Sequence, residues 1–170
     1  MQILLLEDLD TFAQAIQEGL AALRSELGEV SVTRIATEID FRHRLEELAR
    51  RDFDVAIFDV MVAWCTPEEV QTKEGANPPA EVMQEFLGEA RWRSGIRCKH
   101  LFEHARMNLG LPRVPSIYYT VLEAAYLQTE VDDETPTVTK QGDVAALARE
   151  IRRTTSQPKV GLHSRTPRES

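Results

Sequence analysis

Five short apolar runs, separated by longer amphipathic stretches, set the strongest limit on how this chain can fold. Each run has the length and residue types of a buried strand; the runs lie at 2–8, 29–37, 53–59, 115–120 and 135–140. Between them, apolar residues recur at helical spacing, as at Phe12, Ile16 and Leu20, and helices are expected at 9–28, 38–51 and 142–153. Strands alternating with helices predict an α/β fold, a doubly wound five-stranded parallel sheet with right-handed crossovers.

The alternation is interrupted after the third run. Residues 63–80 contain three prolines and a glycine, and two helical stretches follow at about 80–90 and 93–109. Long insertions in a compact domain are usually functional or disordered. We therefore expect residues 63–115 to form an extra helical insert that serves partner recognition or covers the site.

Composition excludes several classes of protein. A net charge of −8 argues against nucleic-acid binding, which needs a basic face, so no direct DNA contact is expected. No run is long enough to span a membrane, and the start "MQILLLEDLD" lacks the basic region of a signal peptide. Cys65 and Cys98 fit free thiols in a reducing compartment. We expect a cytoplasmic protein with no membrane contact, one domain at 1–153 and a flexible basic tail at 154–170.

Polar residues stand where the predicted strands end. The first strand ends on Glu7 and Asp8, the third on Asp59, the fourth on Thr120 and the fifth on Lys140. In an open parallel sheet, ligands bind beyond the carboxyl ends of the strands, where the strand order reverses. If the order is the flavodoxin-like 2-1-3-4-5, the first and third strands are neighbours. Three carboxylates then converge, with a hydroxyl and an ammonium on the adjacent strands.

Such a cluster favours a cation and an anionic substrate. Three crowded carboxylates repel one another, and a buried charge such as Asp59 is costly unless it is paired, protonated or metal-bound. Mg²⁺ suits hard oxygen ligands and commonly joins carboxylates to a substrate phosphate. Lys140 and Thr120 could hold a further anionic group. The set predicts a phosphoryl-transfer site in which a carboxylate becomes an acyl phosphate.

This ordered set resembles the receiver domain of bacterial two-component response regulators. The resemblance runs from residue 1 to about 153. It rests on "ILLLED" as the acidic first strand, "DVAIFDVM" as the phospho-acceptor strand, "SIYYT" as the strand ending in the switch hydroxyl and "TVTK" as the strand ending in the lysine. Each motif is weak alone, but four in the right order on the right elements are fairly specific.

The resemblance implies a role for each polar residue. Asp59 would accept phosphate from a sensor histidine kinase or a phosphotransfer protein. Phosphorylation would act through contact with a downstream protein, which makes the chain a signalling module rather than an enzyme, and a homodimer is compatible with this role. The implied Mg²⁺ ligands are Glu7, Asp8, Asp59 and the backbone carbonyl of Met61, and the implied contacts to the phosphoryl oxygens come from Thr120 and Lys140.

The sequence also departs from the family pattern. The lysine is followed by Gln141 instead of proline, Thr137 stands where the family usually has an aromatic residue, and Val121 stands where it has a small one. About thirty extra residues separate Asp59 from Thr120. An alternative function therefore stays open: a degenerate receiver-like module that binds a partner without phosphotransfer.

Simpler interpretations exist for single residues. Asp8 or Asp10 could cap the first helix, and Asp59 could serve only as an ion-pair partner of Lys140. His100 and His104 have the i, i+4 spacing of zinc ligands, but a lone pair lacks the further ligands that a zinc site needs, so an ordinary helix is expected there.

Overall fold

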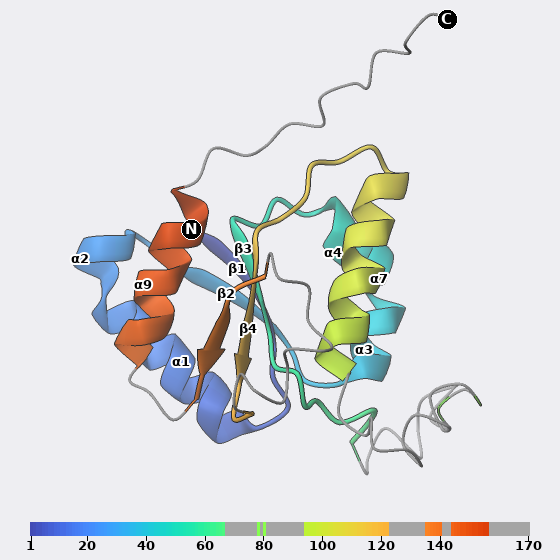
Figure 1. Ribbon diagram of the computed structural model, residues 1–170, viewed down its shortest axis with the longest axis horizontal. Coiled ribbons are helices and arrows are strands. Elements are labelled where there is room, and N and C mark those ends of the chain that lie inside the picture. Colours follow the sequence, from blue (N-terminus) through green and yellow to red (C-terminus); the bar gives the residue numbers. More distant parts are fainter. Residues whose placement is uncertain (67–77, 79, 81–93, 123–134, 141–143, 157–170) are drawn as a thin grey trace, which may run out of the picture.

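The computed structural model describes residues 1–66, 78, 80, 94–122, 135–140 and 144–156. These residues form a five-stranded parallel sheet in the order β2-β1-β3-β4-β5, which confirms the predicted fold (Figure 1). The strands are β1 (Gln2–Leu6), β2 (Ser31–Ile35), β3 (Val55–Phe58), β4 (Ser116–Thr120) and β5 (Thr137–Thr139).

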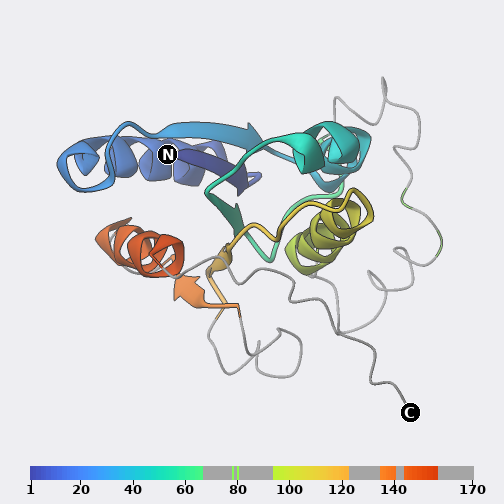
Figure 2. The ribbon, with the colours of Figure 1, turned by 90° about the horizontal axis from the view of Figure 1, so that it is seen from above.

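Helices cover both faces of this sheet (Figure 2). One face carries α1 (Asp10–Ala22) and α9 (Val144–Thr155), which pack against each other, and α2 (Arg24–Leu27) follows α1. The other face carries α3 (Glu38–His43), α4 (Leu45–Arg50) and α7 (Ser94–Asn108). No helix in the described part of the chain is long and apolar enough to cross a bilayer.

The core has two halves because successive side chains of a strand point to opposite faces. Leu4 and Phe58 pack with Phe102 of α7 on one face, whereas Leu5 and Ile57 join the cluster on the other. The four residues of β3 are fully buried. A strand covered on both faces reads as a continuous apolar run, which is why 55–58 stands out in the sequence.

Two predicted helices are each broken into two. The stretch 9–28 divides at Leu23, and the stretch 38–51 divides at Arg44, so that α3 and α4 are separate short helices. Apolar spacing alone predicted continuous helices because it carries no information about these breaks.

The alternative interpretation, in which Asp8 or Asp10 caps the first helix, is wrong. The N-cap is Leu9, which makes no side-chain cap hydrogen bond, and its own backbone N–H donates to Glu7 Oε1 at 3.2 Å. Both carboxylates have other partners: Asp8 Oδ2 accepts from the Ala63 backbone N–H at 3.1 Å, and Asp10 Oδ1 accepts from Arg34 at 2.6 Å.

The predicted insert is described only in part. Its start runs along α3, where Glu38 N–H donates to the Ala63 carbonyl at 3.0 Å and Ile39 N–H donates to the Trp64 carbonyl at 2.9 Å. Its second helical stretch is α7, close to the predicted bounds. The first stretch at 80–90 lies outside the described residues apart from residue 80, as do Gln141 and most of the tail.

Candidate functional site

Three carboxylates meet at the edge of the sheet where β1 and β3 end. These strands pair in parallel with Leu6 opposite Phe58, so the acids that follow them lie side by side. Carboxylate oxygens of Glu7, Asp8 and Asp59 fall within 4.8 Å of one another. Glu7 is fully buried and Asp59 nearly so, whereas Asp8 is partly exposed. The structure thus brings together the three acids that the sequence selected.

Lys140 reaches the same cluster from the end of β5. Its Nζ lies 2.7 Å from Asp59 Oδ2 and 2.6 Å from Glu7 Oε2, and its side chain is 1% exposed. The backbone N–H of Lys140 donates to the Thr120 carbonyl at 2.8 Å, which anchors the lysine to β4. The ion pair between Asp59 and Lys140 is therefore present, but it is one part of a larger charged cluster.

Burial dominates the electrostatics of the two inner acids. Loss of solvent raises the pKa of Glu7 and of Asp59, although the Lys140 ammonium opposes the shift in both cases. The neighbouring carboxylates raise both pKa values further. Glu7 Oε2 also receives no well-directed hydrogen bond from any described residue, despite its short distance to Lys140. Lys140 supplies one positive charge to three carboxylates, so the cluster has excess negative charge and too few hydrogen-bond donors for its oxygens.

Thr120 and Met61 complete the set that the sequence selected. Phe58 pairs with Tyr118, which places Thr120 on the strand beside β3 and slightly beyond the level of Asp59. Its buried hydroxyl accepts from Leu122 N–H at 3.3 Å and so keeps its own hydrogen to donate. Met61 N–H donates to Asp59 Oδ1 at 3.2 Å, which fixes the orientation of that carboxylate.

Arg34 is a site residue that the sequence did not reveal. From β2, its guanidinium donates to the Glu7 carbonyl at 2.9 Å, to the Asp8 carbonyl at 3.0 Å and to Asp10 Oδ1 at 2.6 Å. These three bonds hold the loop that carries the acidic pair. An arginine on an edge strand gives no sequence signal of this role, because its partners belong to a different element.

Gly95 is a second residue that the sequence did not single out. Its backbone N–H donates to the Val60 carbonyl at 3.2 Å, and a Cβ added to it would lie 1.8 Å from the Asp59 carbonyl oxygen. The first turn of α7 therefore rests directly on the backbone that follows Asp59. Only a residue without a side chain allows this approach.

Gly95→Ala is expected to lower the free energy of unfolding by about 2–3 kcal/mol, because the new methyl group meets backbone that has little room to move. Chemical denaturation measures the loss. Gly19→Ala in α1 is the comparison: its Cβ would meet the Val144 side chain at 2.5 Å, so a smaller loss is expected there, because the atoms met belong to a side chain and alanine favours the helix. Equal stability of the Gly95 variant and wild type would contradict the close packing.

Comparison with known proteins identifies the fold. No family model matches the sequence, and no curated protein matches it. Among solved structures, the "BeF3 Activated DrrB Receiver Domain" is 16% identical with a TM-score of 0.56, over 92% of this chain and 97% of that one. A response regulator receiver protein from Sinorhizobium medicae WSM419 is 13% identical with a TM-score of 0.58, over 91% and 94%. One from Burkholderia phymatum is 16% identical with a TM-score of 0.53, over 94% and 98%.

These neighbours show which fold the chain has. The strand order and the helices on both faces are those of a response regulator receiver domain, and the match extends over most of the chain. At these identities the likeness concerns the fold, so the function has to be argued from the site itself.

Proposed function

We propose that this chain is a phospho-acceptor receiver that takes a phosphoryl group onto Asp59 from a histidine kinase or a phosphotransfer protein. The observation that carries the proposal is the cluster itself: Asp59 lies beside two further carboxylates and 2.7 Å from a buried ammonium. Burying like charges close together costs free energy, and a bound ligand of opposite charge would offset this cost. The cluster lies where the strand order reverses between β1 and β3, and open parallel sheets bind ligands at such switch points, which supports the proposal.

The acidic residues fit a divalent cation. Glu7, Asp8 and Asp59 offer hard oxygen atoms, and the single Lys140 ammonium beside them leaves the cluster with capacity for another positive charge. We assign Mg²⁺ to these three residues together with the backbone carbonyl of Met61. When bound, it would neutralise the carboxylates and stabilise charge on the phosphoryl oxygens.

The protein groups that act in the transfer step all belong to this cluster. A carboxylate oxygen of Asp59 attacks the phosphorus of a phosphohistidine; a P–O bond forms, the P–N bond breaks, and the departing imidazole takes up a proton. Lys140 can move its charge from Asp59 to a phosphoryl oxygen, and the Thr120 hydroxyl can donate its hydrogen to another. The phosphorylated domain then signals through a partner protein, so it is not an enzyme in the usual sense.

Labelling of the wild-type protein tests the proposal. With Mg²⁺ and a small phosphodonor, the intact mass should rise by one phosphoryl group, and a chelator should prevent the rise. Transfer from phosphorylated histidine kinases is the second arm. If neither source labels the protein in the presence of Mg²⁺, the alternative holds, namely a degenerate receiver-like module that binds its partner without phosphotransfer.

Arg34→Gln is expected to weaken Mg²⁺ binding several-fold, because the loop carrying Glu7 and Asp8 loses donors to two backbone carbonyls. Arg24→Gln, an exposed arginine of α2, is the control. A calorimetric Mg²⁺ titration measures both. If wild type and the Arg34 variant are both folded and bind Mg²⁺ with the same affinity, the Arg34 hydrogen bonds do not position Glu7 and Asp8 for the metal.

A further inference from the structure

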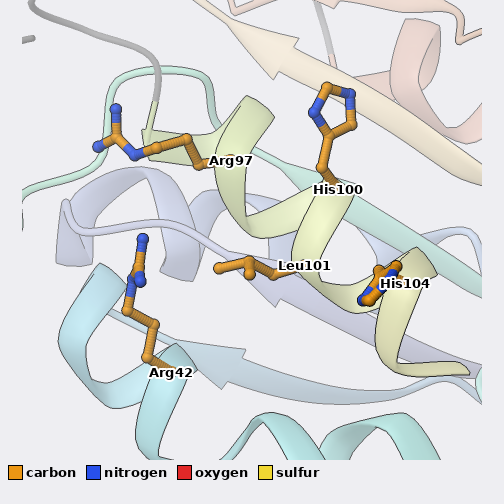
Figure 3. A pocket seen from close by; sticks show the side chains of 5 residues that line it. All are labelled: Arg42, Arg97, His100, Leu101 and His104. Carbon is orange, nitrogen blue, oxygen red and sulfur yellow. The ribbon is translucent and has the colours of Figure 1, made fainter. Parts of the chain in front are cut away.

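The pocket between α3 and α7 is open to solvent and mainly apolar (Figure 3). Its lining residues are Arg42, Arg97, His100, Leu101 and His104. Both guanidinium groups are already bonded to the buried Glu38 carboxylate, Arg42 at 3.0 and 2.8 Å and Arg97 at 3.1 and 2.6 Å. These bonds join α3 to α7, so the two arginines have a structural role and we assign no ligand to the pocket.

A large aromatic side chain beside the acidic cluster lies outside the core. The spacing of Phe12, Ile16 and Leu20 predicts one buried helix face, and Ile16 and Leu20 are buried in the core as expected. Phe12, in the first turn of α1, is only partly buried and belongs to neither core cluster of the described residues. Core packing therefore does not explain why a ring stands at this position.

The ring of Phe12 faces the ammonium of Lys140. The Lys140 Nζ lies 4.7 Å from the centre of the Phe12 ring and 5.9 Å from the centre of the Tyr119 ring. The Lys140 side chain is 1% exposed, and a cation–π contact is stronger when the cation is desolvated. The ammonium thus has two kinds of partner: the carboxylates of Glu7 and Asp59, and aromatic rings from α1 and β4.

We propose that Phe12 is a positioning residue for Lys140, an inference that rests on the proposed function. In phosphoryl transfer the lysine gives up Asp59 Oδ2 and binds a phosphoryl oxygen. Glu7 and Asp59 are also the residues assigned to Mg²⁺, so neither carboxylate is a lasting partner for the ammonium. A ring face attracts the charge without being a ligand of metal or phosphate. Phe12 therefore holds Lys140 beside the acceptor while its hydrogen bonds change partners.

The rate of phosphoryl labelling by a small phosphodonor at saturating Mg²⁺ tests the proposal. Phe12→Leu keeps an apolar side chain but removes the ring, and the rate should fall roughly fivefold, as expected for loss of a desolvated cation–π contact. Phe12→Tyr keeps the ring and should retain most of the rate. Trifluorophenylalanine at position 12 should behave like leucine, because fluorine withdraws electron density from the ring face while the shape changes little.

Phe53 is the matched control for the fluorinated ring. The Arg51 guanidinium lies 5.0 Å from the centre of its ring, and Phe53 precedes β3, whereas Asp59 follows that strand. Trifluorophenylalanine at position 53 thus weakens a cation–π contact that is remote from the acceptor. The labelling rate should equal that of wild type.

Denaturant unfolding in chelator, without phosphodonor, gives a readout that does not depend on phosphotransfer. Phe12→Leu should raise the unfolding equilibrium constant roughly fivefold more in wild type than in a Lys140→Leu background, where there is no cation to lose. The fluorinated ring at position 12 should destabilise the protein by a similar factor, which keeps the test decisive if Lys140→Leu does not fold.

Equal losses in the two backgrounds, or an unchanged labelling rate with the fluorinated ring at position 12, would overturn the positioning role. If wild type is not labelled at all, the proposed function fails and the positioning role fails with it, even where unfolding shows that Phe12 and Lys140 are coupled. Labelled wild type without such coupling overturns the positioning role alone.

Discussion

Asp59→Asn is expected to abolish phosphoryl labelling of this protein. Asp59 is the acid that combines a position at the end of β3 with contact to Lys140 and to two further carboxylates. An amide cannot form the acyl phosphate, and the exchange leaves size and shape almost unchanged. Intact mass after incubation with Mg²⁺ and a phosphodonor measures the effect.

Asp54→Asn is the matched control for this experiment. Asp54 lies just before the same strand, and its exposed carboxylate accepts from Gln2 N–H at 2.8 Å. It is far from the acidic cluster along the strand, so labelling should match wild type. Undiminished labelling of the Asp59 variant would eliminate Asp59 as the acceptor.

The acyl phosphate is expected to be long-lived for its class. In-line hydrolysis needs a polar side chain that holds a water opposite the aspartyl oxygen. The positions two residues beyond Asp59 and Thr120 hold Met61 and Leu122, and Leu122 packs against the core. Neither residue can orient water by hydrogen bonding. A decay time course of the labelled protein tests this, and complete decay within seconds would refute it.

Lys140→Met is expected to lower the free energy of unfolding of the metal-free protein by about 3 kcal/mol at neutral pH. The lysine is the ammonium paired with both Glu7 and Asp59, and removal of one partner from a buried ion cluster leaves charges uncompensated. Methionine fills similar space, so loss of packing contributes little. Denaturant unfolding in chelator measures the loss, and Arg50→Gln, which breaks an exposed pair with Glu46, should change little.

The loss should shrink as the pH falls. Because burial raises the pKa of Glu7 and of Asp59, the folded protein binds more protons than the unfolded chain above about pH 4, where free carboxyl groups ionise. Stability therefore decreases as the pH rises from there through the raised pKa values. Without Lys140 both values should rise further, so the decrease should be steeper and reach higher pH. A Lys140 variant that loses the same stability at pH 5 and pH 8 would contradict this linkage.

The strand order and the cluster at the strand ends could be predicted from the sequence. Alternation of strands and helices is a local pattern, and parallel strands bring their carboxyl ends to one edge of the sheet. The positions of Glu7, Asp8, Asp59 and Lys140 were therefore fixed relative to each other once the order was inferred, and the structure places them together. The presence of helices between the strands was also predicted locally, from apolar residues that recur at helical spacing.

Only the tertiary structure showed how that cluster is held. Arg34 clamps a loop of another element, Gly95 meets the backbone after Asp59, and Asp8 accepts a hydrogen bond from Ala63 instead of capping α1. The pocket between α3 and α7 likewise forms only where side chains of two separate helices meet. Each depends on contacts between residues far apart in the chain, and such contacts leave no periodic signal in the sequence. Periodicity specifies which face of an element is buried, whereas the packing of elements decides which polar groups meet.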